Sequence, residues 1–346
     1  MPTDTIPLSR AAGAMGFSVG VPSSPPGVIR NCLFTVVLVH IVFMRIAVVG
    51  GYGVATTYRV TDLPTPGATL IASERRLDLG GKGSNQAVGA ARLGARVALL
   101  TATGDDEDGE AGRRLWVHEG VFAEHVVRSA AGTMAGAIVV ADSGENQIVL
   151  HQGALSDLTA EDVGRFGGEI EAADVLLVSL EVPLAAASAA LRRARAAGTR
   201  TVLNPAPATT LSMEVLASVD VLTPNWTEAR AIAGARIGLD PTPDEVAAAL
   251  HSMFGGALVI TLGPDGALIL EDGSITRVRA EQVDVVDTTG AGDAFNAAVA
   301  VGLAVGLPLE AAARYGCKVS AFVVQRPGVV PALPFAIDVG RPGDQR

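Results

Sequence analysis

One stretch, Asp287-Thr288-Thr289-Gly290-Ala291-Gly292-Asp293, joins an apolar, strand-like run at residues 283–286 to a helical run at residues 294–305. Backbone N–H groups at a helix start are unpaired and point outward, and the helix dipole adds positive potential there. The small residues of the stretch allow a phosphate to approach these N–H groups closely. The sequence therefore predicts an anion site at this helix start.

Asp293 places a carboxylate inside this expected anion site, where a negative charge is locally unfavourable. Accepting a proton from a hydroxyl that attacks a phosphoryl group would explain its presence. The expected catalytic residues are then Asp293 as the base, together with Gly290, Ala291 and Gly292. The backbone N–H groups of Ala291, Gly292 and Asp293 would form the anion hole. The alternative is that Asp293 only interacts with the helix dipole from the first turn.

A second glycine-rich stretch, Gly80-Gly81-Lys82-Gly83-Ser84-Asn85-Gln86-Ala87, precedes an alanine-rich helix at residues 88–93. It is not a Walker loop, because Gly83 follows Lys82 where that loop needs Ser or Thr. Lys82 and Asn85 are able to donate hydrogen bonds to hydroxyls. Taken alone, the stretch is read more simply as a flexible turn before a helix.

Together and in this order, the two stretches closely resemble the two signatures of the ribokinase-like carbohydrate kinases, and most closely those of its ribokinases. The segments Asn204-Pro205-Ala206-Pro207 and Thr223-Pro224-Asn225 add to the resemblance, which covers about residues 44–335. It implies an α/β fold with a doubly wound, mostly parallel sheet flanked by helices, and a small β lid. It also implies a homodimer formed through that lid.

The activity implied by the resemblance is transfer of the γ-phosphoryl group of ATP to a primary hydroxyl of a pentose, first of all D-ribose to give ribose 5-phosphate. Deoxyribose, a nucleoside or another sugar is the alternative acceptor on the same fold. The implied cofactors are ATP as co-substrate, Mg²⁺ and a monovalent cation, K⁺. The residues implied to bind the sugar are Gly81, Lys82, Asn85, Glu181 and Asp293.

Glu181 follows an apolar run at residues 177–180, at the carboxyl end of an expected strand, where open α/β sheets bind ligands. One departure from the family concerns the Asn and Asp that hold the ring hydroxyls after the first strand. Gly53 and Ala55 stand at these positions, which implies a larger, less polar pocket and weaker binding of ribose.

Asn225 and Glu228 follow another strand end and lie three residues apart, so both would share one helical face. Their oxygen atoms suit a hard cation, and the resemblance implies that they organise Mg²⁺ and its waters. A capping box, with Asn225 at the N-cap and Glu228 at the third position, is the alternative and is compatible with the metal role.

The segment Thr261-Leu262-Gly263-Pro264-Asp265-Gly266 also follows a strand and resembles the nucleotide loop of the family, although an ordinary glycine turn fits it equally well. The residues implied to bind the nucleotide are Asn225, Thr261, Gly263, Gly266, Gly292 and Cys317. For Cys317, the role of a small buried hydrophobe is sufficient. The residues implied to bind the monovalent cation, largely through backbone carbonyls, are Asp287, Thr289, Val323, Arg326 and Gly328.

The chain has 346 residues and a net charge of −10, which argues against nucleic acid as a partner. Its 49% hydrophobic content is typical of buried parallel strands. Two cysteines, Cys32 and Cys317, provide neither a disulfide framework nor a metal-binding spacing, which favours a cytoplasmic location. The apolar run at residues 32–43 is shorter than the roughly 20 residues that span a bilayer, so no membrane partner is expected.

Short apolar runs alternate with helical stretches from Met44 onward. The expected strands lie at residues 45–50, 97–101, 175–179, 201–203, 221–223 and 258–261, and the expected helices at 183–197 and 243–254. Thr242 and Glu245 predict a capping box for the second of these helices. Two lid segments, near residues 58–79 and 134–152, interrupt the alternation, and the second reads as a hairpin with strands at 135–141 and 147–151.

The expected organisation is one kinase domain over residues 44–335, followed by a tail at 336–346. Residues 1–43 are interpreted as a non-native or disordered extension, with Met44 as the natural start. A membrane-associating segment is the alternative for that extension.

Two other functions compete with the kinase. The run Gly51-Tyr52-Gly53-Val54-Ala55-Thr56, with Glu74 further on, partly matches the dinucleotide turn of an NAD-type oxidoreductase, but Thr56 replaces its third glycine. A non-catalytic sugar sensor is the other alternative. The presence of four residues suited to catalysis argues against it: Asp293, Lys82, Asn225 and Glu228.

Overall fold

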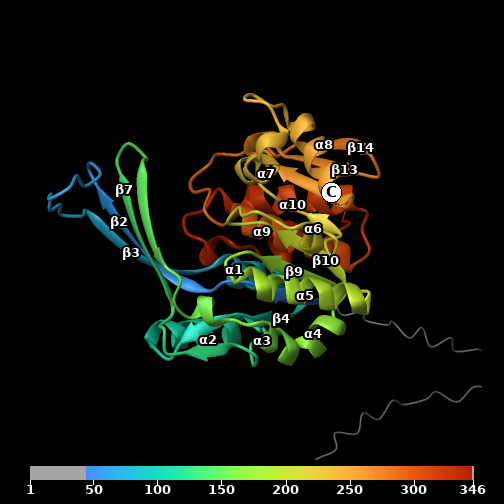
Figure 1. Cartoon of the computed structure of the whole chain (residues 1–346). Coiled ribbons are helices and arrows are strands. Elements are labelled where there is room, and N and C mark those ends of the chain that lie inside the picture. Colours follow the sequence, from blue (N-terminus) through green and yellow to red (C-terminus); the bar gives the residue numbers. More distant parts are fainter. Residues whose placement is uncertain (1–43, 345–346) are drawn as a thin grey trace, which may run out of the picture. The chain divides into compact units, whose positions relative to one another are not determined.

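The computed structural model describes residues 44–344, and the expectations for residues 1–43 fall outside the described part. Its main element is an eight-stranded sheet in the order β14-β13-β12-β11-β10-β9-β1-β4 (Figure 1). Neighbouring strands from β4 to β12 pair in parallel, and β13 and β14 pair antiparallel at one edge. The strands are β1 Arg45–Val49, β4 Arg96–Leu100, β9 Val175–Ser179, β10 Arg200–Asn204, β11 Val221–Leu222, β12 Ala257–Thr261, β13 Ala267–Glu271 and β14 Ser274–Val278.

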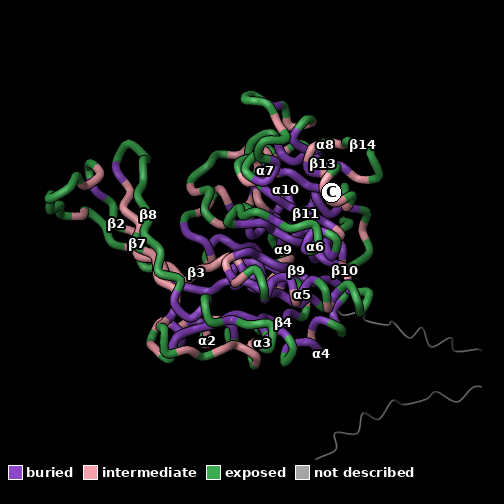
Figure 2. The backbone as a smooth tube through the Cα atoms, viewed as in Figure 1, coloured by how far each residue is buried: buried purple, intermediate pink, exposed green. Residues whose placement is uncertain are grey.

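Two hydrophobic cores cover the two faces of this sheet, because successive side chains of a strand point to opposite faces. Ile46 and Val48 of β1 belong to one core, and Ala47 and Val49 belong to the other. Figure 2 shows the central strands of this sheet, such as β9 and β11, as buried. Helices α1 Lys82–Arg92, α9 Ala291–Ala304 and α10 Leu309–Val323 contribute to the first core, and α3 Ala160–Arg165, α4 Gly167–Glu171, α5 Leu184–Ala197, α6 Met213–Leu216, α7 Trp226–Ala233 and α8 Pro243–Phe254 to the second. The expected doubly wound α/β fold is confirmed.

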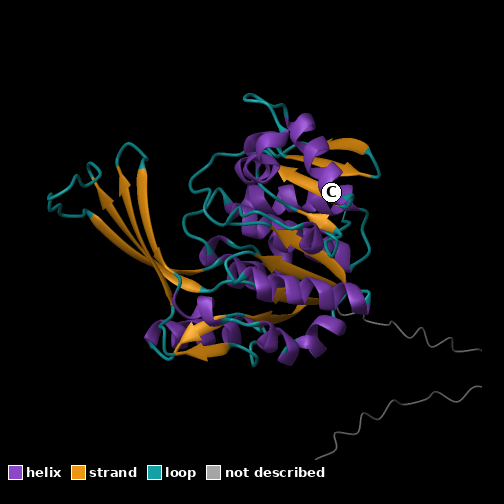
Figure 3. Ribbon diagram, in the orientation of Figure 1, coloured by secondary structure: helices purple, strands orange, loops and turns teal. Residues whose placement is uncertain are grey.

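A second sheet of four strands extends from the main body and forms the lid (Figure 3). Its order is β3-β2-β7-β8, with β2 Gly53–Val60, β3 Glu74–Gly80, β7 Met134–Ala141 and β8 Asn146–His151. β7 and β8 form the hairpin that the sequence predicted. The remaining strands and α-helices are β5 Ala102–Gly104, β6 Val127–Ser129, α2 Glu107–Glu119 and α11 Ala336–Val339.

The strand expected at residues 283–286 is wrong. These residues form an irregular segment in which Val285 and Val286 are exposed. The N–H of Val286 donates to the carbonyl of Val324 at 2.7 Å, just beyond the end of α10, and no strand partner is present among residues 44–344. Apolar composition alone therefore predicted a strand where the chain forms an irregular segment beside the end of α10.

Both glycine-rich stretches enter their helices earlier than expected. α9 begins at Ala291 and α1 at Lys82, so Asp293 and Asn85 each lie in a first turn. None of the helices in residues 44–344 combines the length and the apolar character needed to cross a membrane.

Candidate active site

The site lies where β1 and β9 end and α1 begins. Glycines at these ends allow the segment after β1 to pack closely against the start of α1 and against Glu181. A Cβ added to Gly83 would lie 2.4 Å from the carbonyl carbon of Gly50, and one added to Gly51 would lie 2.6 Å from Oε2 of Glu181. Gly53 then opens the lid strand β2. A dinucleotide turn must open a helix, so the structure excludes the oxidoreductase reading of this run.

Asp293 is buried in the first turn of α9 and accepts hydrogen bonds from two side chains of α1. Its Oδ2 accepts from Asn85 Nδ2 at 2.8 Å, and its Oδ1 accepts from Gln86 Nε2 at 3.3 Å. Burial raises the pKa of Asp293, and the nearby Lys82 charge with these two hydrogen bonds offsets only part of that rise. The carboxylate is thus held in place with an increased affinity for a proton.

Glu181 and Lys82 complete the polar part of the site. Oε2 of Glu181 accepts from the backbone N–H groups of Lys82 at 2.7 Å and of Gly83 at 3.4 Å. Burial and the charge of Asp293 raise the pKa of Glu181 to about 7. Burial alone would lower the pKa of Lys82, but the carboxylates of Asp293 and Glu181 outweigh it and raise this pKa. Lys82 therefore stays charged under the influence of these two carboxyl groups.

The stretch expected to form the anion hole has free donors. Gly290 caps α9 with φ of 79°, a left-handed conformation that favours glycine. The N–H of Ala291 donates to the carbonyl of Thr288 at 3.3 Å, whereas the N–H groups of Gly292 and Asp293 have no backbone acceptor among the described residues. The available donors are therefore those of Gly292 and Asp293.

Asn225 and Glu228 form the capping box of α7. Asn225 Oδ1 accepts from the N–H of Glu228 at 2.8 Å, and Glu228 Oε2 accepts from the N–H of Asn225 at 2.9 Å. Burial raises the pKa of Glu228, and Lys82 and Asp293 act on it with opposite signs. The carboxylate of Glu228 is therefore close enough to interact electrostatically with Lys82 and Asp293. Its Oε1 takes no part in the capping box. Residues 44–344 contain no cluster of three or more His, Cys, Asp or Glu arranged for direct metal binding.

A pocket of about 330 Å³ lies beside the free N–H groups of α9. Its lining includes the expected nucleotide residues Thr261, Gly263, Gly266, Gly292 and Cys317. Asn225 does not line it but pairs with Thr261 through a parallel bridge. Phe295 and Ser320 also line the pocket and were not expected from the sequence. Burial raises the pKa of Cys317 to about 11, so this thiol is uncharged and forms part of the pocket lining.

The residues expected at the monovalent-cation site fall into two groups. Asp287 accepts from the N–H of Thr289 at 2.9 Å and from the N–H of Gly328 at 3.1 Å. Burial raises the pKa of Asp287, but these hydrogen bonds outweigh it and lower this pKa overall. The N–H of Arg326 donates to the carbonyl of Val323 at 3.0 Å, and no hydrogen bond within the described residues links this pair to Asp287.

Sequence reasoning did not assign a role to the polar side chains behind Asp293. Gln86 Nε2 also donates to Asn204 Oδ1 at 3.1 Å, and Asn204 Nδ2 donates to the carbonyl of Thr223 at 3.0 Å. Thr223 in turn donates to Asn296, which donates to the carbonyl of Gly292 at 2.8 Å. The signal that could have found Asn204 and Thr223 is their position at the carboxyl ends of β10 and β11.

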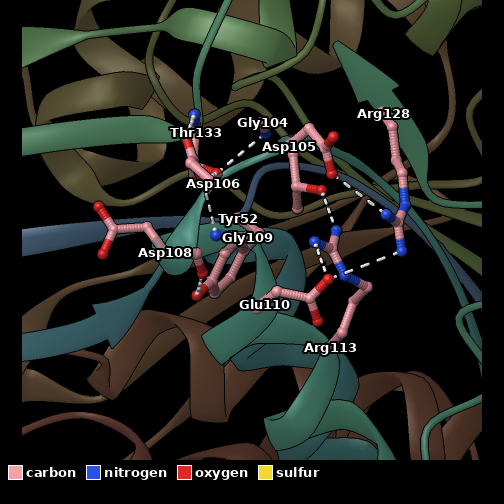
Figure 4. A network of polar contacts seen from close by, with 11 residues as sticks. Tyr52, Gly104, Asp105, Asp106, Asp108, Gly109, Glu110, Arg113, Arg128 and Thr133 are labelled. Carbon is pink, nitrogen blue, oxygen red and sulfur yellow. Dashed lines mark hydrogen bonds and ion pairs between the residues drawn. The ribbon is translucent and has the colours of Figure 1, made fainter. Parts of the chain in front are cut away.

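Figure 4 shows a second polar network that fixes the base of the lid to the start of α2. Asp106 caps α2 by accepting from the N–H of Gly109 at 2.8 Å, and it also accepts from the N–H of Thr133 at 2.7 Å. The hydroxyl of Tyr52 donates to the carbonyl of Asp108 at 2.8 Å. Tyr52 and Thr133 directly precede β2 and β7, so both central lid strands begin at anchored residues.

The expectation of a larger pocket at Gly53 is wrong. A Cβ added to Gly53 would lie 2.5 Å from the carbonyl oxygen and 2.6 Å from Cε of Met134. Met134 thus fills the space that a side chain at position 53 would take. Ala55 pairs with Asp78 of β3 on one side and with Gly136 of β7 on the other.

Residues 45–336 match the family described as pfkB family carbohydrate kinase. The ribokinase of Haemophilus influenzae is 36% identical over 271 residues, which are 78% of this chain and 88% of that protein. The deoxyribokinase of Salmonella typhi is 32% identical over 298 residues, 84% of this chain and 96% of that protein. The structure of Arabidopsis thaliana ribokinase complexed with ribose and ATP is 25% identical, with a TM-score of 0.78 over 86% of this chain and 97% of that one.

Proposed function

The chain belongs to the pfkB family of carbohydrate kinases, and we propose that it transfers the γ-phosphoryl group of ATP to a primary hydroxyl of a pentose, with D-ribose as the first candidate. The observation that carries this proposal is the placement of Asp293. A buried carboxylate of raised pKa lies beside two free N–H groups at a helix start. Such a pair suits proton removal from a hydroxyl next to a charged phosphoryl group.

In the proposed mechanism, Asn85 and Gln86 hold the Asp293 carboxylate while it accepts the proton of the sugar hydroxyl. The resulting oxygen attacks the γ-phosphorus, and the bond from that phosphorus to the bridging oxygen of ADP breaks. The N–H groups of Gly292 and Asp293 donate hydrogen bonds to the transferred phosphoryl oxygens and so stabilise their negative charge. Removing one such donor typically costs about 3 kcal/mol of transition-state stabilisation.

Lys82 and Glu181 orient the acceptor sugar in this proposal. The Glu181 carboxyl group accepts two backbone N–H groups through one oxygen, which leaves Oε1 for a sugar hydroxyl. The raised pKa of Lys82 keeps its ammonium group charged, so it donates to hydroxyls and offsets the negative charge that collects beside it. Both groups therefore position the substrate and leave the proton transfer to Asp293.

We assign Mg²⁺ to the side of Glu228, where it would neutralise phosphate charge. Glu228 Oε2 is used by the capping box, so the remaining oxygen fits an ion better through a water than in a closed set of direct ligands. We assign K⁺ to the loop of Asp287, Thr289 and Gly328, with the carbonyl of Val323 and Arg326 beside it. The lowered pKa of Asp287 supports this assignment because it keeps a negative charge there.

The lid is proposed as the surface of a homodimer. Tyr58, Leu77 and Val149 lie on one face of the lid sheet by their register, and they are 37%, 51% and 72% exposed. A row of exposed apolar side chains on a small sheet favours burial against a second copy. The cytoplasm is the proposed compartment, since Cys317 is a free thiol.

A coupled assay of ADP release with a panel of sugars tests the function. We expect turnover with D-ribose, dependent on ATP, and none without sugar. 2-Deoxy-D-ribose is the second candidate, favoured by the similarity to a deoxyribokinase and by the absence of polar side chains at Gly53 and Ala55. Turnover with no pentose or nucleoside of the panel would contradict the proposal.

A further inference from the structure

The lid turns one face toward the catalytic body. By register, Asp78, Ala55, Gly136 and Leu150 lie side by side on that face, one from each of the four strands. Arg76 lies on the same face, two residues before Asp78, and its Nη2 is 3.9 Å from Oδ2 of Asp287 at the start of the α9 stretch. We call this surface the inner face of the lid.

Asp78 is the carboxylate of that row. Its Oδ2 accepts from Arg76 Nε at 2.7 Å, and its Oδ1 accepts no hydrogen bond from any residue in the described part of the chain. The side chain is only 20% exposed. A Cβ added to Gly328 would lie 3.9 Å from Oδ1, so this oxygen lies beside the loop of Gly328. A carboxylate oxygen that no protein group donates to is available to accept a hydrogen bond from a ligand hydroxyl.

The neighbours of Asp78 leave room for such a ligand. This room lies beside Ala55, whose side chain is a single methyl group. The adjacent Gly136 is covered by Leu150, whose Cδ2 would lie 3.0 Å from a Cβ added there. At the end of the inner face nearest the body, Met134 fills the space beside Gly53 with apolar atoms. β3 continues from Asp78 through Gly80 to Lys82, a path of roughly 13 Å at about 3.3 Å per residue. The same short segment thus carries both Asp78 and the lysine of the site.

Resting on the proposed sugar-kinase function, we propose that Asp78 accepts a hydrogen bond from a ring hydroxyl of the acceptor sugar and is the residue of the lid that distinguishes hydroxylated from deoxygenated pentoses. Arg76 holds the carboxylate in position, and Met134 supplies an apolar wall beside it. The polar contact missing at Ala55 is thereby provided from the adjacent strand. A site that reads a hydroxyl rejects the analogue that lacks it, because its own polar group is then left unpaired.

The test compares Asp78→Asn with the unsubstituted protein on D-ribose, 2-deoxy-D-ribose and 3-deoxy-D-ribose. We expect the variant to lose about 10- to 100-fold in kcat/KM for D-ribose through a higher KM, with kcat nearly unchanged. For the deoxy sugar that lacks the contacted hydroxyl, the loss should be less than about twofold. An equal loss on all three sugars would overturn the inference, since Asp78 would then act only by holding Arg76.

Glu74→Gln is the matched control, because Glu74 lies on the same strand and face with its side chain 60% exposed, and the charge change is identical. It should leave the sugar preference unaltered. If Asp78→Asn does not fold, Asp78→Ala combined with Ala55→Asp moves the carboxylate to the registered position, and the preference for D-ribose should persist; its loss would overturn the inference. An unsubstituted protein without pentose turnover contradicts the proposed function, whereas turnover with no selective loss contradicts only the role of Asp78.

Discussion

Asn85 Nδ2 lies 2.8 Å from Asp293 Oδ2, and this hydrogen bond joins the first turns of two helices whose residues are 208 positions apart. The contact aligns the stretch of α1 that we propose to bind the sugar with the proposed anion site of α9. Since Gln86 holds the other carboxylate oxygen, the direction of the Asp293 side chain is fixed from α1. The two glycine-rich stretches therefore form one site only because α1 and α9 pack on the same face of the main sheet.

Asp293→Asn should lower kcat by at least about a thousandfold and leave ATP binding close to unchanged. The amide has the same shape as the carboxylate but cannot accept the proton. Steady-state kinetics and nucleotide titration by calorimetry measure the two effects. Asp284→Asn, which removes an exposed carboxylate of the preceding segment, is the control. A kcat within about tenfold of the unsubstituted protein would mean that Asp293 is not the base.

Glu181 should make the protein without substrate less stable as the pH rises. Its pKa is about 7 in the folded protein, against 4.5 for an unperturbed carboxyl group. The folded state therefore binds more protons between these values, and the free energy of unfolding falls as pH increases from about 4.5 to 7, by at most about 3 kcal/mol. Glu181→Gln should remove this fall, so the Tm of the variant should gain on that of the unsubstituted protein between pH 5 and pH 8. Parallel Tm curves of the two proteins over this range would show that the pKa of Glu181 is not raised in the folded protein.

Sequence reasoning was most successful where structure depends on neighbouring residues. β9 and α8 were predicted at their observed bounds, because a buried parallel strand is a continuous apolar run and Thr242 with Glu245 forms a local capping box. It was wrong at residues 283–286, where apolar residues have no strand partner. The roles of Gln86 and Met134 depend on contacts with Asp293 and Gly53 that only the folded chain creates.

Glu228→Gln should raise the Mg²⁺ concentration required for half-maximal rate several-fold, since the amide keeps the capping box but loses the charge that attracts hydrated Mg²⁺. The measurement is a Mg²⁺ titration of the initial rate at fixed ATP. Glu245→Gln is a close control, because Glu245 occupies the same position in the capping box of α8. An identical titration for the two variants would exclude the metal role of Glu228.

Asp106→Ala tests whether the base of the lid must be fixed for the sugar to bind. The change removes the cap of α2 and the acceptor of Thr133, so the free energy of unfolding should fall by about 1–2 kcal/mol. It should also raise the KM for the sugar more than the KM for ATP, because β7 starts from Thr133. The pocket that we propose for the nucleotide lies elsewhere, between the η3 loop (Gly263–Asp265), α9 and α10. Thr242→Ala removes the equivalent cap of α8 and should destabilise the protein to a similar degree without a sugar-specific effect. If both variants change the two KM values alike, the network at the lid base serves stability alone. A selective rise for the sugar would show that the start of α2 sets the position of the lid strands above the acceptor.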